Sequence, residues 1–334
     1  MTKRIVSFFV CSILIFNSCD QDPIDRNKSI FDTTEKTKTP FEEWLYENYT
    51  KEYNIDFKYK FEDIESDIRY NLVPAREENA VALAQIVKHV WIDAYDEMLG
   101  NKHFMRKYVP KIIHLIGSPA YNDDGSIVLG TAEGGLKVTL YMVNNLDVNS
   151  IDMENLNYYY FHTMHHEFAH ILHQTKEYDT EWKQISNADY IGNNWIYEVR
   201  DTVKYRKKGF ISAYSMMNHN EDFVEYYSYY VTNSQSWWDN EWAKGGAEGI
   251  AIMNKKLTIV RNYFKQVWNI DLDKMREIVL SRSAEVPTLG LLTFTNSGDS
   301  SPIPQKSAFH SDVPFDKRAT LYPDRIKSCS CNSH

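Results

Sequence analysis

The residues with the clearest chemical potential are two histidines and a glutamate in the sequence HEFAH, residues 166–170. The surrounding stretch TMHHEFAHILHQ contains no glycine or proline and has the apolar spacing of an α-helix. On a helix, residues i and i+4 lie on one face, so the imidazoles of His166 and His170 can bind one Zn²⁺ ion. Glu167 is then placed to take a proton from a water molecule that the metal activates. The pattern predicts metal-assisted hydrolysis.

A catalytic zinc site has three protein ligands and one open position, so a third ligand has to come from elsewhere. His173 is one candidate, but it lies about 10 Å along the helix axis from His166, which is too far for one straight helix to place three rings around one ion. No glycine separates His170 from His173 to break the helix. We therefore expect His173 to contact one of the metal-binding residues without binding the metal itself, to lie in the core, or to face substrate.

The other candidates are glutamates in the acidic, aromatic segment HNEDFVEYYSYYVT, residues 219–232. Glu221 and Glu225 are four residues apart, so their carboxylates share one face of a helix. The apolar Phe223 and Val224 would bury that helix against the core. One carboxylate can then bind zinc and the other can accept a hydrogen bond from a ligand histidine. The alternative is an acidic face that only contacts water.

Other polar residues near these motifs are expected to lie away from the metal. We interpret His162 and His165 as packing or surface residues that lie off the ligand face of their helix. Asp222 points away from Glu221 on helical geometry, so we expect it to face solvent or a helix cap.

The elements around the motifs predict an α+β domain with a small sheet, the motif helix and a helical C-terminal part. Strands followed by a motif helix and further helices are the usual element order of a zinc-protease catalytic domain. We expect the last strand before the motif helix to be the sheet edge on which an extended substrate adds. The predicted helices are 77–98, 155–175, 181–208, 219–232, 247–268 and 271–284; the predicted strands are 111–117, 126–130 and 136–144, with turns at 122–125 and 134–135.

HEFAH together with the spacing Y-x6-E-x-F-x-E of Tyr214, Glu221 and Glu225 resembles the glutamate-zincins of the anthrax lethal factor type. In that family the first glutamate of the E-x-F-x-E helix binds zinc, and a tyrosine seven residues before it stabilises the oxyanion. The resemblance implies that Glu221 is the third ligand of one zinc ion, Tyr214 the transition-state donor, and Glu225 a support for a ligand histidine. His219 is an alternative donor, although we expect it at the surface near the start of its helix.

Residues 1–18 have the pattern of an export signal. Lys3 and Arg4 precede an apolar run at residues 5–16 that is too short to span a membrane as a helix. The sequence FNSC ending at Cys19 resembles a bacterial lipoprotein cleavage site, which implies that Cys19 becomes lipidated; cleavage nearby by an ordinary signal peptidase is the alternative. The sequence Asp20-Gln21-Asp22, with two acidic residues directly after Cys19, resembles a surface-export signal, so we expect an outer-membrane lipoprotein exposed on a Gram-negative cell.

Composition sets the remaining boundaries. The 334 residues are 43% hydrophobic, which is enough for a sizeable core. We predict a flexible tether at 19–40, one catalytic domain at 41–285 and a loosely ordered tail at 286–334.

The net charge of −9 argues against a nucleic-acid partner. Cys329 and Cys331 are too close for a relaxed disulfide, and without a cysteine-rich zinc site the metal would be held by histidine and carboxylate.

Residues 1–285 as a whole resemble the zinc-binding metallopeptidase lipoproteins associated with outer-membrane nutrient import in Gram-negative anaerobes. The resemblance implies a surface-anchored zinc hydrolase acting on peptides or glycopeptides beside import proteins, and it names no particular substrate. Two alternatives stay open. One is an accessory lipoprotein that binds peptide or glycan on an aromatic surface, which the 23 Tyr and 8 Trp support. The other is an envelope scaffold in which the histidine motif occurs by chance and binds no metal.

Overall fold

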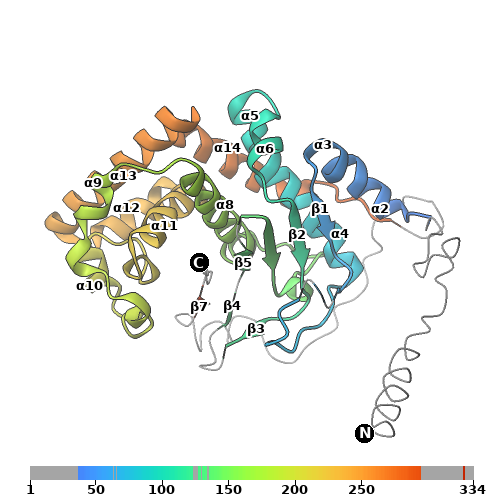
Figure 1. Ribbon diagram of the computed structural model, residues 1–334, viewed down its shortest axis with the longest axis horizontal. Coiled ribbons are helices and arrows are strands. Elements are labelled where there is room, and N and C mark those ends of the chain that lie inside the picture. The colour runs from blue at the N-terminus through green and yellow to red at the C-terminus, as the bar shows by residue number, and fades with distance from the viewer. Residues whose placement is uncertain are drawn as a thin grey trace, which may run out of the picture. The chain divides into compact units, whose positions relative to one another are not determined.

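The computed structural model describes residues 37–62, 64, 66–122, 127–128, 130–133, 135–294 and 326–327. The chain divides into two compact units, Met1–Lys38 and Thr39–His334, and the second contains the elements described below (Figure 1). The predicted export signal, Cys19, most of the predicted turn at 122–125, and Cys329 and Cys331 lie outside the described residues. Among the helices that the structure describes, none has the length and apolar character needed to cross a membrane.

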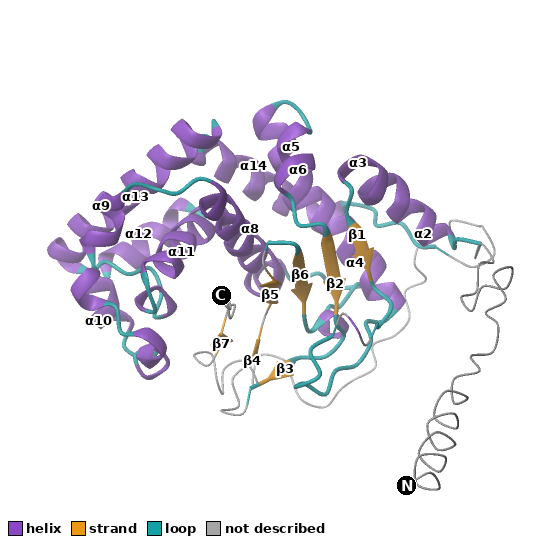
Figure 2. Cartoon of the chain, in the orientation of Figure 1, coloured by secondary structure: helices purple, strands orange, loops and turns teal. Residues whose placement is uncertain are grey.

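Four strands form a mixed sheet in the order β1-β2-β6-β5, with α8 against β5 (Figure 2). The first three strands are parallel, and β5 runs antiparallel to β6. The bounds are β1 Asp56–Lys58, β2 Ile112–Leu115, β5 Gly130–Glu133 and β6 Lys137–Leu140. A smaller sheet joins β3 (Ala120–Tyr121), β4 (Ile127–Val128) and β7 (Ile326–Lys327) in the order β3-β4-β7.

The last strand before the motif helix is not a sheet edge. β6 lies between β2 and β5, and all four of its residues are buried, as expected for a strand with neighbours on both sides. The prediction that this strand is the substrate edge is therefore wrong, because the chain folds back from β5 and leaves β5 outermost. Gly130 allows the close approach of β5 to the motif helix, since a Cβ there would lie 2.4 Å from Thr163 Cγ2.

The first half of the domain supplies helices that pack around this sheet. Thr39 and Glu42 form a capping box at the start of α2, in which each side chain bonds the other residue's backbone N–H. The predicted helix 77–98 is present as three continuous segments, including one π turn. The bounds are α2 Pro40–Leu45, η1 Tyr46–Thr50, α3 Lys51–Tyr53, α4 Glu77–Val87, η3 Lys88–Ile92, α5 Asp93–Leu99 and α6 His103–Tyr108.

The second half is helical, which together with the sheet confirms the predicted α+β class. Helices 219–232, 247–268 and 271–284 are present with boundaries within a residue or so of the prediction, whereas α12 was not predicted. The bounds are α7 Met153–Leu156, η5 Asn157–Phe161, α8 His162–Thr175, α9 Thr180–Ile185, α10 Thr202–Lys207, α11 His219–Thr232, α12 Gln235–Ala243, α13 Gly246–Trp268 and α14 Leu272–Glu285.

The predicted helix 181–208 is largely wrong. Between α9 and α10 the chain forms two short 3-10 turns, η6 (Asn187–Asp189) and η7 (Gly192–Tyr197). Gly192 has a φ of +57°, and asparagine and aspartate favour turns over helix interiors, so this polar stretch does not continue the helix.

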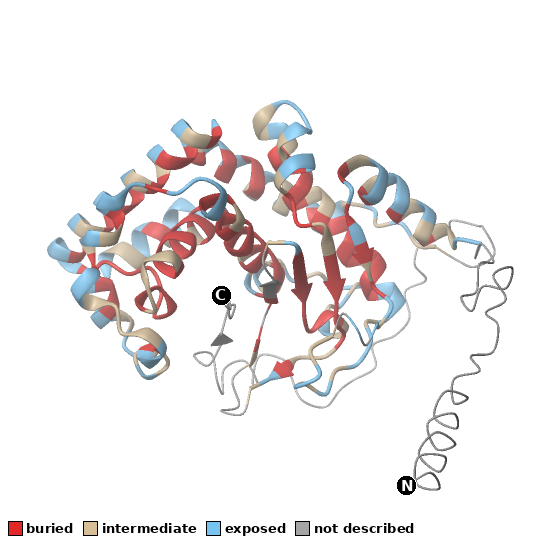
Figure 3. Ribbon diagram, viewed as in Figure 1, coloured by how far each residue is buried: buried red, intermediate tan, exposed pale blue. Residues whose placement is uncertain are grey.

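Helices α8 and α11 pack against each other and are buried along most of their length (Figure 3). Phe168 fixes α8 to the first half of the domain, because its ring lies 5.6 Å from that of Trp91 and 5.0 Å from that of Tyr95. Phe223 anchors α11, with its ring 4.2 Å from Tyr178. Polar side chains on the facing sides of these two helices are consequently held away from water.

The packed domain extends beyond the predicted boundary at residue 285. Gln85 exchanges two hydrogen bonds with the backbone of Leu292, at 3.0 and 2.8 Å. The ring of Phe294 stacks 5.6 Å from that of Phe41 on α2. Residues 286–294, predicted as part of a loosely ordered tail, are therefore held by apolar and backbone contacts that the polar composition of the segment hides.

Candidate metal centre

Three side chains predicted as metal ligands meet between α8 and α11. His166 Nε2 lies 3.2 Å from His170 Nε2, and Glu221 Oε2 lies 3.2 Å from each of these nitrogens. All three residues are buried. Their spacing follows from the two helices: α8 places the histidines one turn apart, and α11 presents Glu221 from its first turn.

The size of this triangle fits a tetrahedral zinc ion. Zinc bonds to imidazole nitrogen and carboxylate oxygen measure about 2.0–2.2 Å, so two ligands of a tetrahedral ion lie about 3.3–3.6 Å apart. The three edges of 3.2 Å lie close to the lower end of that range. Two imidazoles and one carboxylate are also the donor set of known catalytic zinc sites, which keep the fourth position open.

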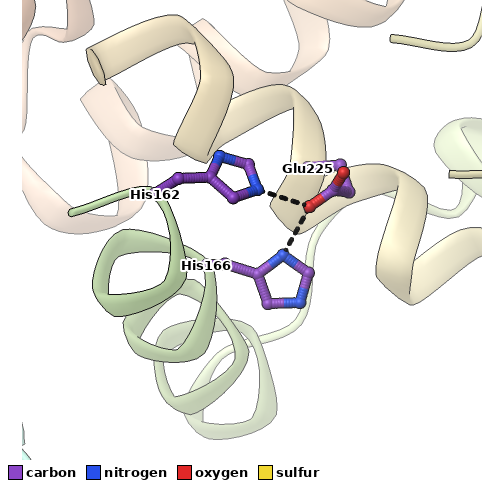
Figure 4. Close-up of side chains that lie close together, drawn as sticks. All are labelled: His162, His166 and Glu225. Carbon is purple, nitrogen blue, oxygen red and sulfur yellow. Dashed lines mark hydrogen bonds and ion pairs between the residues drawn. The ribbon is translucent and has the colours of Figure 1, made fainter. Parts of the chain in front are cut away.

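Glu225 lies directly behind His166 on the same face of α11 as Glu221. Its Oε1 lies 2.8 Å from His166 Nδ1 and 2.9 Å from His162 Nε2 (Figure 4). Ser212 Oγ donates to Glu225 Oε2 at 2.6 Å. A proton on His166 Nδ1, donated to Glu225, leaves the Nε2 lone pair for the metal.

The expectation for His162 is wrong, whereas that for His165 agrees with the structure. His162 precedes His166 by four residues and so shares its helix face, which the sequence itself could have shown. It contacts Glu225 at the site. His165 is fully buried, and its Nδ1 lies 3.1 Å from the hydroxyl of Tyr95, as expected for a packing residue.

His173 contacts His170, a candidate metal ligand, at the ring nitrogen that does not face the metal site. This is one of the three positions expected for His173. Its Nε2 lies 3.0 Å from His170 Nδ1. Burial, together with the nearby charge of His170, lowers the pKa of His173 to about 3, so this imidazole is neutral at physiological pH. A neutral His173 with its proton on Nδ1 can accept the hydrogen bond of His170 Nδ1–H.

The charges at the site favour an ionised carboxylate ligand. Burial opposes ionisation of Glu221, but the charge of His170 and the hydrogen bonds from both imidazoles lower its pKa to about 2. Burial likewise opposes a charge on His166, yet hydrogen bonds with Glu221 and Glu225 raise its pKa well above the ordinary value, so a metal ion has to displace the proton from His166 Nε2 when it binds. Glu221 is therefore in its metal-binding form at neutral pH.

The two residues predicted to act on substrate also lie at this centre. Glu167, which lies between the two histidines in the sequence, is fully buried and contributes to the electrostatic field at His166. Tyr214 begins η8 (Tyr214–Met216), and its ring centre lies 6.0 Å from that of His166. The ring of Trp195 packs edge-on against Tyr214 at 5.0 Å. His219, the alternative donor, is partly buried, and its Nδ1 lies 2.8 Å from the hydroxyl of Tyr178.

Asp222 does not face solvent or a cap as expected. It is fully buried, and its Oδ2 accepts hydrogen bonds from Lys256 Nζ at 2.7 Å and from the hydroxyl of Tyr190 at 2.9 Å. The ammonium group of Lys256 also lies 4.1 Å from the ring centre of Phe210. The helical spacing gave the correct direction for Asp222 but could not show that α13 covers that side of α11.

Replacing Lys256 with methionine is expected to destabilise the fold by about 3–5 kcal/mol, because the buried carboxylate of Asp222 loses its counter-charge. The double variant Lys256→Met/Asp222→Asn should recover much of this loss. Urea unfolding followed by circular dichroism measures both. The adjacent Lys255→Met is a matched control, since Lys255 pairs with Glu181 at the surface and should change stability by no more than about 0.5 kcal/mol. Equal effects at the two lysines would contradict the prediction.

Comparison with known proteins places the chain in a family. The family described as "putative zinc-binding metallo-peptidase" matches residues 34–273, a region that includes α8 and α11. The chain belongs to this family. A crystal structure at 2.10 Å resolution of "a putative zinc-binding metallo-peptidase" from Bacteroides caccae ATCC 43185 is 45% identical. It aligns over 79% of this chain and 98% of its own length, with a TM-score of 0.67. None of the curated proteins compared matches the chain.

Membership of the zinc-binding metallo-peptidase family agrees with the α+β fold and with the donor set between α8 and α11. Within the described residues, a second group of possible ligand atoms comes from His162, His166 and Glu225. The sequence interpretation missed two residues at this centre, His162 and Ser212, which both bond Glu225.

Proposed function

We propose that this family member is a zinc-dependent peptidase with one catalytic zinc ion held by His166, His170 and Glu221. The observation that carries the proposal is the triangle of 3.2 Å edges formed by these three donors, with the carboxylate of Glu167 on the same helix. Burial of all four side chains supports it, because a dry site strengthens the electrostatic effects on which such catalysis depends.

Different residues of the chain would carry out the different steps of peptide hydrolysis. A bound zinc ion would polarise the scissile carbonyl and lower the pKa of a water molecule. Glu167 takes a proton from the attacking water as the new C–O bond forms. It then donates that proton to the leaving nitrogen as the C–N bond breaks, so the carboxylate is regenerated. Tyr214 donates a hydrogen bond to the oxyanion that develops on the carbonyl oxygen.

Replacing Tyr214 with phenylalanine is expected to lower kcat by about 10²- to 10³-fold with little change in KM, because the lost hydrogen bond forms mainly in the transition state. Steady-state kinetics on a cleaved peptide measures both constants. Tyr197→Phe is the matched control, since Tyr197 ends the 3-10 turn η7, in the segment between α9 and η8, and is 79% exposed. An unchanged kcat for Tyr214→Phe would assign the donor role elsewhere, with His219 as the next residue to replace.

The proposed substrate is an extended peptide or glycopeptide. β5 is the outermost strand of the four-stranded sheet, beside the helix that carries Glu167. Backbone groups on the free side of such a strand can pair with a peptide, which presents its carbonyl groups at regular intervals. This arrangement supports a peptide more than a folded or compact substrate.

We also propose that a lipid on Cys19 anchors the chain to the outer membrane, exposed at the cell surface and close to import proteins. The signal-like residues 1–18 and the two acidic residues Asp20 and Asp22 support this placement. Metabolic labelling with palmitate in the native type of host should label the wild-type chain and not Cys19→Ala. Label on both variants, or on neither, would contradict the anchor.

The peptidase proposal is tested with the purified full chain and a mixture of peptides of defined sequence. Mass spectrometry should detect new termini that disappear with a zinc chelator and return when zinc is restored. Stable binding of peptides without any cleavage would instead support an accessory binding lipoprotein.

A further inference from the structure

His162, His166 and Glu225 form a second group (Figure 4). It lies at Nδ1 of His166, whereas Glu221 lies at Nε2 of the same ring. The distances between its polar atoms show whether the group can bind a second metal ion or is joined by hydrogen bonds. Glu225 Oε1 lies 2.9 Å from His162 Nε2 and 2.8 Å from His166 Nδ1. Ligands of one zinc ion lie about 3.3–3.6 Å apart, whereas hydrogen bonds from N–H to oxygen measure about 2.7–3.2 Å. These contacts are hydrogen bonds rather than edges of a second metal site.

Glu225 is a buried carboxylate that accepts from three side chains. His166 and His162 donate to Oε1, and Ser212 donates to Oε2. A carboxylate held at both oxygens cannot rotate without losing a charge-assisted hydrogen bond. The donors His162 and Ser212 therefore help to fix the orientation of the hydrogen bond that Glu225 accepts from His166.

The side chain of His162 is held by its hydrogen bond to Glu225 and by aromatic packing. Among the residues that the structure describes, its Nδ1 has no hydrogen-bond partner, and its Nε2 bonds Glu225. Its ring packs 4.3 Å from that of Tyr229, which in turn stacks on Trp237 at 5.2 Å. The aromatic rings set the position of the imidazole, and the imidazole sets the position of the carboxylate.

The backbone before His162 also ties the two helices together. The N–H of His162 donates to the carbonyl of Asn157 across the π turn η5, and the side chain of Asn157 donates to the carbonyl of Thr232 at the end of α11. The start of α8 is thereby fixed to the helix that carries Glu225. A wide π turn is often found next to a functional site.

We propose that His162 is a positioning residue for the metal ligand His166, acting through Glu225. Its hydrogen bond keeps Glu225 in place to accept from His166 Nδ1–H, and so keeps the Nε2 lone pair of His166 directed at the metal. The inference rests on the proposed zinc site. Loss of an outer hydrogen-bond partner of a zinc ligand typically weakens metal binding by about 10- to 100-fold.

Two substitutions separate the hydrogen bond from the packing. His162→Phe keeps a ring against Tyr229 and removes the donor, whereas His162→Gln loses the ring and keeps an N–H that reaches Glu225. The zinc dissociation constant of the full chain is measured by competition with a chromophoric chelator. We expect His162→Phe to raise it about 10- to 100-fold and His162→Gln to change it by less than about threefold. The exposed His103→Gln serves as a control for the loss of a histidine.

A double-mutant cycle tests whether His162 acts through Glu225. In the Glu225→Ala background, His162→Phe should have little further effect on zinc affinity, because the acceptor that it positions is already gone. Additive effects, equal effects of Phe and Gln, or wild-type affinity of His162→Phe would each overturn the inference. If His162→Phe does not fold, His162→Asn, whose shorter amide does not reach Glu225, takes its place. A wild-type chain that binds no zinc would refute the proposed function instead.

Discussion

Glu167→Gln is expected to reduce peptide hydrolysis by about 10²- to 10⁴-fold while the chain keeps its zinc. Glutamine has the size of glutamate but cannot take a proton from water at neutral pH, so the proton transfers at both ends of the reaction are lost. The two histidines of the motif and Glu221 are untouched, which is why metal content should not change. Turnover of a cleaved peptide and zinc content by atomic emission are measured on the same preparation.

The matched control is Glu154→Gln, which removes an exposed carboxylate from the helix α7 just before the motif. It should retain full activity and zinc. Full activity of Glu167→Gln would refute the proposed proton-transfer role. Loss of zinc together with activity would show that Glu167 supports the metal site rather than the chemistry.

Glu221→Ala is expected to lower zinc content from about one ion per chain to a small fraction after dialysis against a weak chelator. The variant leaves only His166 and His170, and two imidazoles do not complete the three-ligand site that a catalytic zinc ion requires. Zinc content is measured by atomic emission, and folding is checked by circular dichroism because the side chain is buried.

Glu248→Ala, which removes an exposed carboxylate from α13, controls for a nonspecific effect of lost charge. Equal zinc in wild type and Glu221→Ala would refute Glu221 as the third ligand, and His173→Ala would be tested next. No zinc in either protein would favour a binding or scaffold lipoprotein over a peptidase.

Local patterns in the sequence predicted the elements that carry the site. Helix α11 occupies residues 219–232 as predicted, because its apolar and acidic residues alternate with helical period and Asn218 caps its first turn. The same period placed His166 and His170 on one face and Glu221 and Glu225 on another, and the structure brings the two faces together. A pattern that repeats within one helix can be read without knowing the partner helix.

What the sequence could not show depends on contacts between distant residues. Asp222 is buried because Lys256 of α13 covers it, and β6 is interior because β5 folds back beside it. Neither neighbour is visible in the local spacing. His162 is a different case, since its distance of four residues from His166 placed it on the ligand face, and only its partner Glu225 needed the fold.

Helix α11 is held by charges on two sides at adjacent positions. Glu221 faces the imidazoles of α8, and Asp222, the next residue, is bonded to Lys256 of α13. Rolling the helix about its axis in either direction would break one of these contacts, so its orientation is locked. The segment between α9 and η8 depends on the same orientation, because Tyr190 bonds Asp222 and Ser212 bonds Glu225. A change that turned α11 would therefore displace this segment together with the candidate metal ligand Glu221.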